Sequence, residues 1–283
     1  MRLRAVLIGT TVVFLLVTVG VYLVVQKFAQ ELPLPTPIAR ACEIKTTSGT
    51  VLLDPAQTAN AATIAAVGIR RKVPDRAVVV ALATAMQESK LENLEGGDRD
   101  SIGLFQQRPS QGWGQPQQII DPRYSARKFY DALLKVRGWE AMRVTEAAQR
   151  VQRSAYPEAY EKWAADAAVL TEALTGRAVG AVNCTLVGEP EARGVAAATA
   201  LGEGLTLDWG VTSEPTSDVP GLALAPTSLI TGWQFAHWLV AHSEQRSVQR
   251  VRYGDLEWTA KTGEWAKAAT AATDRVVAEV YTA

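Results

Sequence analysis

The amino-acid sequence predicts one membrane-spanning helix, followed by a mainly α-helical domain and then by a small α+β domain. Three observations lead to this prediction. An uncharged apolar run occupies residues 5–25, helix-start signals with apolar stripes recur between residues 50 and 175, and segments rich in Pro, Ser, Thr and Gly begin near residue 188. A length of 283 residues allows one or two domains that each bury a core.

The apolar run has the length of a transmembrane helix. As a helix, Ala5 to Val25 would extend about 31 Å, close to the ~30 Å hydrocarbon core of a bilayer. Arg2 and Arg4 precede the run and only Lys27 follows closely, so the basic bias predicts a cytoplasmic N-terminus and an extracytoplasmic remainder. A cleaved signal peptide is the alternative, because Ala39-Arg40-Ala41 has a small-x-small pattern, although signal-peptide apolar regions are usually only ~7–15 residues long.

Composition divides the rest of the chain. Alternating prolines after the apolar run favour an extended spacer. The predicted parts are a cytoplasmic tail with the membrane anchor (1–27), a Pro-rich linker (28–47), the α-helical domain (48–186) and the C-terminal domain (187–283).

The chain has two cysteines, Cys42 and Cys184. Both lie on the predicted outer side of the membrane, where oxidation is permitted. We expect them to form a disulfide bond, which for a loop of more than ~100 residues stabilises by at most about 4–5 kcal/mol in the chain-entropy model. Two free buried thiols are the alternative.

Helix signals repeat between the two cysteines. Asp54-Pro55 and Asp121-Pro122 each offer an N-cap carboxylate followed by a proline at the first helical position. Another apolar run extends from Arg76 to Met86 and leads into Glu88. Apolar residues at helical spacing follow Asp121 and Pro157; they are Ala126, Phe129, Tyr130, Leu133 and Leu134, and then Tyr160, Trp163, Ala167, Leu170 and Leu174.

Glu88 lies at the end of the helix expected over the run from Arg76 to Met86, just before a polar loop. The loop, residues 91–100, is too long for a tight turn, and long loops are often functional. A carboxyl beside a cleft at the end of an apolar helix is placed where burial favours the neutral form, which a general acid needs. A glutamate at a helix end is otherwise usually a solvated surface residue.

Three separated motifs occur in one order around Glu88. They are Glu88-Ser89, then Ser101–Gln106 with Trp113, then Ala155–Tyr160. In order and spacing they resemble the lytic transglycosylase and goose-type lysozyme superfamily, and in particular its branch of actinobacterial envelope proteins. The resemblance covers roughly residues 50 to 175 and implies a lysozyme-like fold for the domain 48–186.

The resemblance also implies an activity and a set of site residues. Glu88 would protonate the glycosidic oxygen between N-acetylmuramic acid and N-acetylglucosamine in peptidoglycan. Ser101, Gln106 and Tyr156 match positions that line the sugar groove. Trp113, between two glycines, could stack on a sugar face.

The number of carboxylates separates two reaction types. A transglycosylase needs one carboxyl, because the muramyl 6-hydroxyl closes on its own sugar. A hydrolytic muramidase needs a second carboxylate, for which Asp98 and Asp100 are the nearby candidates. Because solvated loop acids are the more ordinary interpretation of both residues, we favour the lytic transglycosylase, acting without a cofactor.

The C-terminal domain shows a different pattern. Alternating runs on both sides of Gly254-Asp255 predict a β-hairpin, and residues 232–243 and 264–280 are expected to be helical. The pattern Gly232-Trp233, His237–His242, Val251-x-Tyr253, Trp258 and Gly263-x-Trp265 resembles a C-terminal domain of actinobacterial wall proteins. That domain is similar to hedgehog-type zinc peptidases, but their metal-binding segment is missing here. His237 and His242 are five residues apart, not at the i, i+4 spacing of a helical zinc pair, so we expect no metal and a non-catalytic wall- or partner-binding module.

The expected partners follow from these inferences. They are peptidoglycan glycan strands, the membrane through the N-terminal helix, and cell-envelope proteins. Nucleic acid is excluded, because 29 basic residues balance 29 acidic ones and phosphate binding needs a basic surplus. The rival function is that of a non-catalytic peptidoglycan-binding or envelope scaffold protein.

Overall fold

The first described strands alternate buried and exposed residues. The structure, a computed structural model, describes residues 41–282. Strand β1 (Ala41–Thr46) pairs antiparallel with β2 (Gly49–Leu53) and with β3 (Val182–Thr185), which gives the sheet order β2-β1-β3. The alternate residues Cys42 and Ile44 of β1 are fully buried, as expected for a sheet with one covered face.

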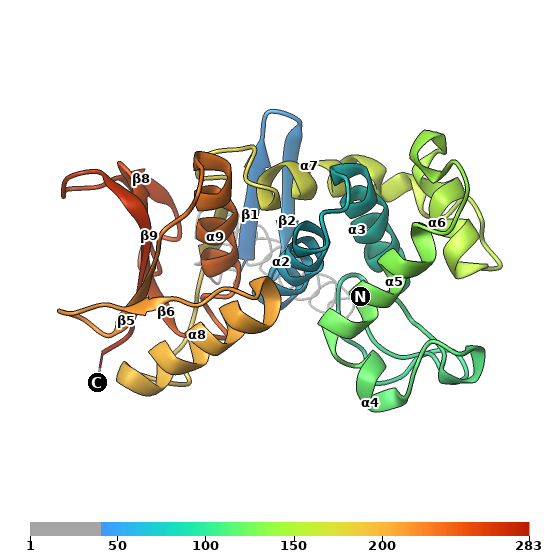
Figure 1. The fold of residues 1–283 in the computed structure, drawn as a ribbon, viewed down its shortest axis with the longest axis horizontal. Coiled ribbons are helices and arrows are strands. Elements are labelled where there is room, and N and C mark those ends of the chain that lie inside the picture. Colours follow the sequence, from blue (N-terminus) through green and yellow to red (C-terminus); the bar gives the residue numbers. More distant parts are fainter. Residues whose placement is uncertain (1–40, 283) are drawn as a thin grey trace, which may run out of the picture. The chain divides into compact units, whose positions relative to one another are not determined.

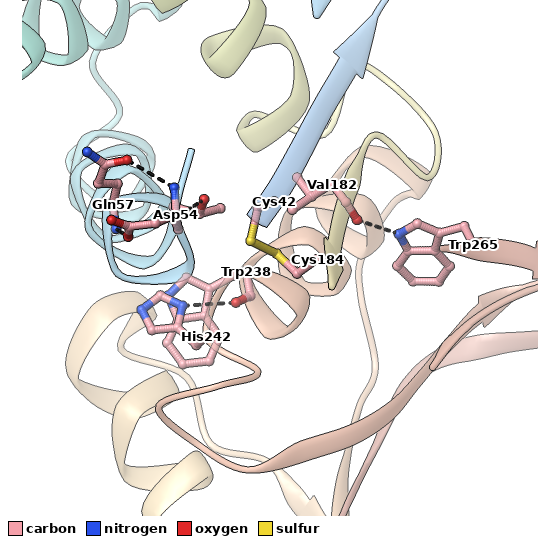
Figure 2. Close-up of a disulfide and its surroundings, with 9 residues drawn as sticks. Cys42, Asp54, Gln57, Val182, Cys184, Trp238, His242 and Trp265 are labelled. Atoms are coloured by element: carbon pink, nitrogen blue, oxygen red, sulfur yellow. Dashed lines mark hydrogen bonds between the residues drawn. A yellow bond between two sulfur atoms is a disulfide. The ribbon is translucent and has the colours of Figure 1, made fainter. Parts of the chain in front are cut away.

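The disulfide bond joins the two ends of the first half of the chain. Cys42 on β1 lies directly opposite Cys184 on β3, and their sulfur atoms are bonded, as predicted. Figure 2 shows this bond and, on the same strand β3, the carbonyl of Val182, which accepts from the Trp265 Nε1–H at 2.9 Å. The disulfide therefore connects two strands through residues that are 142 positions apart, and Trp265 is hydrogen-bonded to one of these strands.

Helices fill the segment between β2 and β3. The predicted caps are confirmed: the Asp54 carboxylate accepts from the Gln57 backbone N–H, and the Asp121 carboxylate from that of Arg123. Each satisfies an N–H group that the first helical turn leaves free. The helices are α2 (Pro55–Arg70), α3 (Asp75–Ser89), α4 (Pro116–Ile119), α5 (Pro122–Leu133), α6 (Val144–Gln152) and α7 (Ala164–Leu174).

A second antiparallel sheet dominates the last third of the chain (Figure 1). Its order is β4-β5-β9-β6-β7-β8. Helices α8 (Gly194–Trp209) and α9 (Leu229–Ala241) pack against it and also against α2. The strands are β4 (Glu214–Pro215), β5 (Gly221–Leu224), β6 (Val248–Gly254), β7 (Leu256–Thr259), β8 (Trp265–Lys267) and β9 (Thr273–Val280).

Two expectations for this region have opposite outcomes. The hairpin around Gly254-Asp255 is confirmed, with Val251 opposite Trp258. The helix expected over 264–280 is wrong, because this segment forms β8 and β9. Val276, Ala278 and Val280 of β9 are buried at alternate positions, and β9 pairs on both sides, with β5 and β6. Burial between two strands therefore outweighs the helix propensity of the alanine-rich segment 264–280.

The predicted fold class is also wrong. We expected a mainly α-helical lysozyme-like domain between a transmembrane helix and a small α+β domain, but the described chain combines its helices with two antiparallel sheets. The strand β1 lies inside the expected linker 28–47. No helix within residues 41–282 is both long and apolar enough to cross a membrane, and the expected membrane helix at 5–25 lies outside the described residues.

A buried ionic cluster connects the two halves of the described chain. Asp208, near the end of α8, is fully buried. Its carboxylate forms an ion pair with Arg123 of α5 at 2.5 Å. It also accepts from the Thr63 hydroxyl of α2 at 2.9 Å and from the Trp238 indole of α9 at 2.8 Å. One carboxylate thus holds four helices together, and residues 41–282 form one compact unit.

His237 makes a second buried polar connection. The backbone N–H of Ala181 donates to its Nε2 at 2.9 Å, so Nε2 carries no proton. The Nδ1 atom lies 2.8 Å from the Ala173 carbonyl and is therefore the donor. Burial lowers the pKa of His237 to about 4. The fold consequently requires the neutral imidazole.

We predict that this neutral imidazole makes the protein less stable in acid. An unfolded histidine takes up its proton near pH 6.5, but the folded one only near pH 4. The contribution of His237 is therefore complete above pH 6.5 and falls by about 3 kcal/mol as the pH drops to about 4. Denaturant unfolding of wild type and of His237→Gln, above pH 6.5 and near pH 4, gives the free energy of unfolding at each pH. On acidification the variant should lose about 3 kcal/mol less of this free energy than wild type. Equal losses in the two proteins would contradict the prediction.

Candidate functional site

Glu88 occupies the last turn of α3, one residue before the helix ends at Ser89. Its side chain is half-buried. The preceding turns of α3 are apolar and buried, so the helix is fixed in the core while its end reaches the surface. This is the position that the apolar run from Arg76 to Met86 predicted.

A buried tyrosine holds the Glu88 carboxylate. The hydroxyl of Tyr160 donates to Glu88 Oε1 at 2.6 Å. The Tyr160 side chain has no solvent exposure. Burial, and then the Glu88 carboxylate, raise the pKa of Tyr160 far above its ordinary value, so the hydroxyl keeps its proton and remains a donor.

The residue after Glu88 connects the helix end to the loop that follows. Ser89 Oγ donates to the Leu104 carbonyl at 2.8 Å. Leu104 and Phe105 are fully buried in a tight turn, which the antiparallel bridge between Ile102 and Gln107 closes. The Glu-Ser pair and the Gly-Leu-Phe-Gln segment are therefore in direct contact, as a common site would need.

A tryptophan covers the other side of the helix end. The Trp163 Nε1–H donates to Gln87 Oε1 at 3.0 Å. The Lys90 ammonium lies 4.2 Å from the centre of the Trp163 ring, within the range of a cation–π interaction. Burial, and then the charge of Lys162, lower the pKa of Lys90. The residues on both sides of Glu88 are thus fixed by side chains from 160–163.

Two predicted groove residues lie in the loop region. Ser101 is buried, and its backbone N–H donates to the Asp98 carbonyl. Gln106 has a left-handed backbone, with φ of 45°, and its side-chain Nε2 donates to the Gly103 carbonyl at 3.2 Å. The side chain packs so closely on Gly97 that a Cβ at Gly97 would collide with Gln106 Oε1. Among the described residues neither Ser101 nor Gln106 bonds to Glu88.

The remaining predicted contacts are further separated. Tyr156 is 74% exposed and makes no hydrogen bond to Glu88, whereas Tyr160, four residues later, does. Trp113 is half-buried and lines a cavity of about 710 Å³ between α5, α6 and the turn at 111–113. Glu88 does not line that cavity. The structure therefore does not place Tyr156 or Trp113 in contact with Glu88.

The two candidate second carboxylates differ in their surroundings. The Asp98 side chain is 91% exposed. Asp100 accepts from Arg108 Nε at 2.7 Å and from the Ser110 backbone N–H at 2.8 Å. These hydrogen bonds, chiefly that from Arg108, hold the pKa of Asp100 well below its usual range. Both oxygens of Asp100 are thus used in fastening its own loop.

Comparison with known proteins identifies no family, since no family model matches the sequence and no curated protein matches it significantly.

Sequence reasoning did not single out Tyr160 and Trp163 as site residues. Both belong to the apolar stripe after Pro157, which indicated the core. Each also carries a polar atom that needs a partner when buried. A hydroxyl and an indole N–H three residues apart in one stripe were the available signal.

Proposed function

We propose that the protein cleaves the glycan strand of peptidoglycan as a lytic transglycosylase, with Glu88 as the acid and base. The observation that carries the proposal is the hydrogen bond from buried Tyr160 to half-buried Glu88, at the junction of the Glu-Ser, Gly-Leu-Phe-Gln and Tyr-Pro-Glu-Ala-Tyr segments. This bond fixes one oxygen of the carboxyl, and a general acid has to be held in one position.

The reaction needs one carboxyl in two states. Protonated Glu88 gives its proton to the glycosidic oxygen, and the bond from that oxygen to the muramyl C1 breaks. The resulting Glu88 carboxylate takes the proton of the muramyl 6-hydroxyl, whose oxygen bonds to C1 and forms the 1,6-anhydro ring. The proton returned to Glu88 restores the starting state.

The surroundings of the loop acids support this reaction over hydrolysis. A hydrolase needs a second carboxylate that is free to activate water or to attack C1. Asp100 is engaged by Arg108 and Ser110, and Asp98 points into solvent. The disulfide bond is consistent with a protein that works outside the cytoplasm, where peptidoglycan lies.

The test is to incubate the purified full-length chain with isolated peptidoglycan and to identify the soluble products by mass spectrometry. We expect 1,6-anhydro-muropeptides. Products with reducing ends would identify a hydrolase and overturn the transglycosylase. Binding to peptidoglycan without any product would favour the non-catalytic scaffold instead.

Tyr160→Phe is expected to slow cleavage by about 10- to 100-fold. The change removes only the hydroxyl that holds Glu88, and a hydrogen bond to a charged group contributes about 1.5–3 kcal/mol. Tyr281→Phe is the matched control, since it removes the hydroxyl of a tyrosine in the C-terminal region. Tyr156→Phe tests separately the exposed tyrosine that the resemblance assigns to the sugar groove. Initial rates of product release measure all three variants. A slower Tyr156→Phe with an unchanged Tyr160→Phe would transfer the role to Tyr156.

A further inference from the structure

The cavity of about 710 Å³ between α5 and α6 carries an excess of positive charge. Four of its lining residues are cations: Lys128, Lys135, Arg150 and Arg153. None of the four forms an ion pair within 4 Å with a residue of the described chain. The walls therefore leave these charges for another partner.

The acids around the cavity are already engaged. Asp131, the acidic residue in its lining, forms an ion pair with Arg71 at 2.5 Å. Glu146, whose charge also acts on Arg150, accepts from Arg143 at 3.1 Å. The open volume thus combines uncompensated cations with the half-buried ring of Trp113. This combination fits a ligand that has both a sugar face and anionic groups.

Two contacts connect the cavity to the Glu88 region. Gln152 of the lining donates to the Phe105 carbonyl at 2.8 Å, in the turn that Ser89 contacts through Leu104. Arg153, also in the lining, precedes Ser154, whose side chain interacts with Tyr160. The cavity therefore borders the segments that hold Glu88.

We propose that this cavity binds the carboxylates of the stem peptides that peptidoglycan carries on its muramyl residues. The inference rests on the proposed function for the identity of the glycan. The muramyl sugar that reacts at Glu88 bears a lactyl-linked peptide, so the nearest anions of the bound strand are carboxylates. The planar guanidinium groups of Arg150 and Arg153 match carboxylate geometry.

The test is binding of the full-length chain to peptidoglycan, measured by co-sedimentation in a Glu88→Gln background so that the ligand stays intact. Lys135→Ala, Arg150→Ala and Arg153→Ala are combined, because these three side chains are exposed and their loss leaves the core unchanged. The matched control removes three exposed cations outside the cavity, with Arg137→Ala, Lys261→Ala and Lys267→Ala.

We expect the cavity variant to bind peptidoglycan at least about tenfold more weakly, and the control to bind like the parent. Added salt should weaken the parent more than the cavity variant. On glycan strands that amidase has freed of stem peptides and that are immobilised on beads for sedimentation, parent and variant should bind alike. On peptidoglycan stripped of phosphodiester polymers, the difference should persist.

Three results would overturn the inference: equal binding of parent and cavity variant, a loss that persists on strands without peptides, or a loss confined to walls that carry phosphodiesters. Failure of the proposed function is separate, because product release by the wild-type chain measures it. If the wild-type chain cleaves peptidoglycan and the cavity variant binds it as well as the parent does, only this inference is overturned. If the variants bind as expected but the wild-type chain releases no product, only the catalytic proposal is overturned.

Discussion

Glu88→Gln is expected to lower the rate of glycan cleavage by about 10²- to 10⁴-fold, the range that a positioned general acid contributes. The amide has nearly the shape of the carboxyl, and its oxygen can still accept from Tyr160, so the site should keep its arrangement. It cannot donate an acidic proton or remove one from the 6-hydroxyl. Release of anhydro-muropeptides, measured against enzyme concentration, gives the rate.

Glu92→Gln provides the matched control for this change. Glu92 is exposed, four residues further along the chain, and we expect wild-type rates from it. Thermal unfolding should be nearly the same for both variants. A Glu88→Gln protein that retains more than about one-tenth of the activity would rule out Glu88 as the acid, since a general acid is worth at least about a hundredfold.

Asp208→Ala should destabilise the protein by about 3–5 kcal/mol, the cost of removing one partner from a buried ion pair. The change leaves Arg123 without its ion pair to α8. It also leaves the Thr63 hydroxyl and the Trp238 indole without their acceptor. Because all these groups lie between helices of the two halves, urea unfolding should show a lower midpoint for the whole described unit.

Two further variants separate charge from truncation. Asp208→Asn keeps an acceptor oxygen for Thr63 and Trp238 but loses the charge that pairs with Arg123, so its loss should be smaller. Glu203→Ala removes an exposed acid from the same helix and should change stability by less than about 0.5 kcal/mol. A loss below about 1 kcal/mol for Asp208→Ala would show that water replaces the carboxylate without penalty.

Local signals predicted the helices well. Asp54 and Asp121 set the starts of α2 and α5, because a cap and a proline act within a few residues of each other. The strands β1 and β3 were missed. Each strand is short, and the two pair through residues that are 142 positions apart. A local sequence pattern cannot predict pairing over such a separation. The alternation of Cys42 and Ile44 was present but was read as linker.

The site was predicted in part, for a similar reason. The place of Glu88 at the end of an apolar helix was predictable from the sequence, but only the resemblance implied its role. Its partner Tyr160 lies 72 residues away. The apolar stripe indicated that Tyr160 would be buried, but no local pattern shows that its hydroxyl bonds to Glu88. The fold brings these two groups together and leaves Tyr156 exposed. The basic cavity also depends on the fold, since its cations come from separate segments.

The disulfide bond also determines how the protein carries mechanical load. Tension applied to the backbone at Ala41 reaches Cys42 after one residue and crosses directly to Cys184. The load-bearing path then continues along the backbone from Cys184 onward. Residues 43–183, including Glu88 and Tyr160, form a closed loop outside this path. Pulling on the chain from its N-terminal side would therefore leave the geometry of this candidate site unloaded for as long as the disulfide remains oxidised.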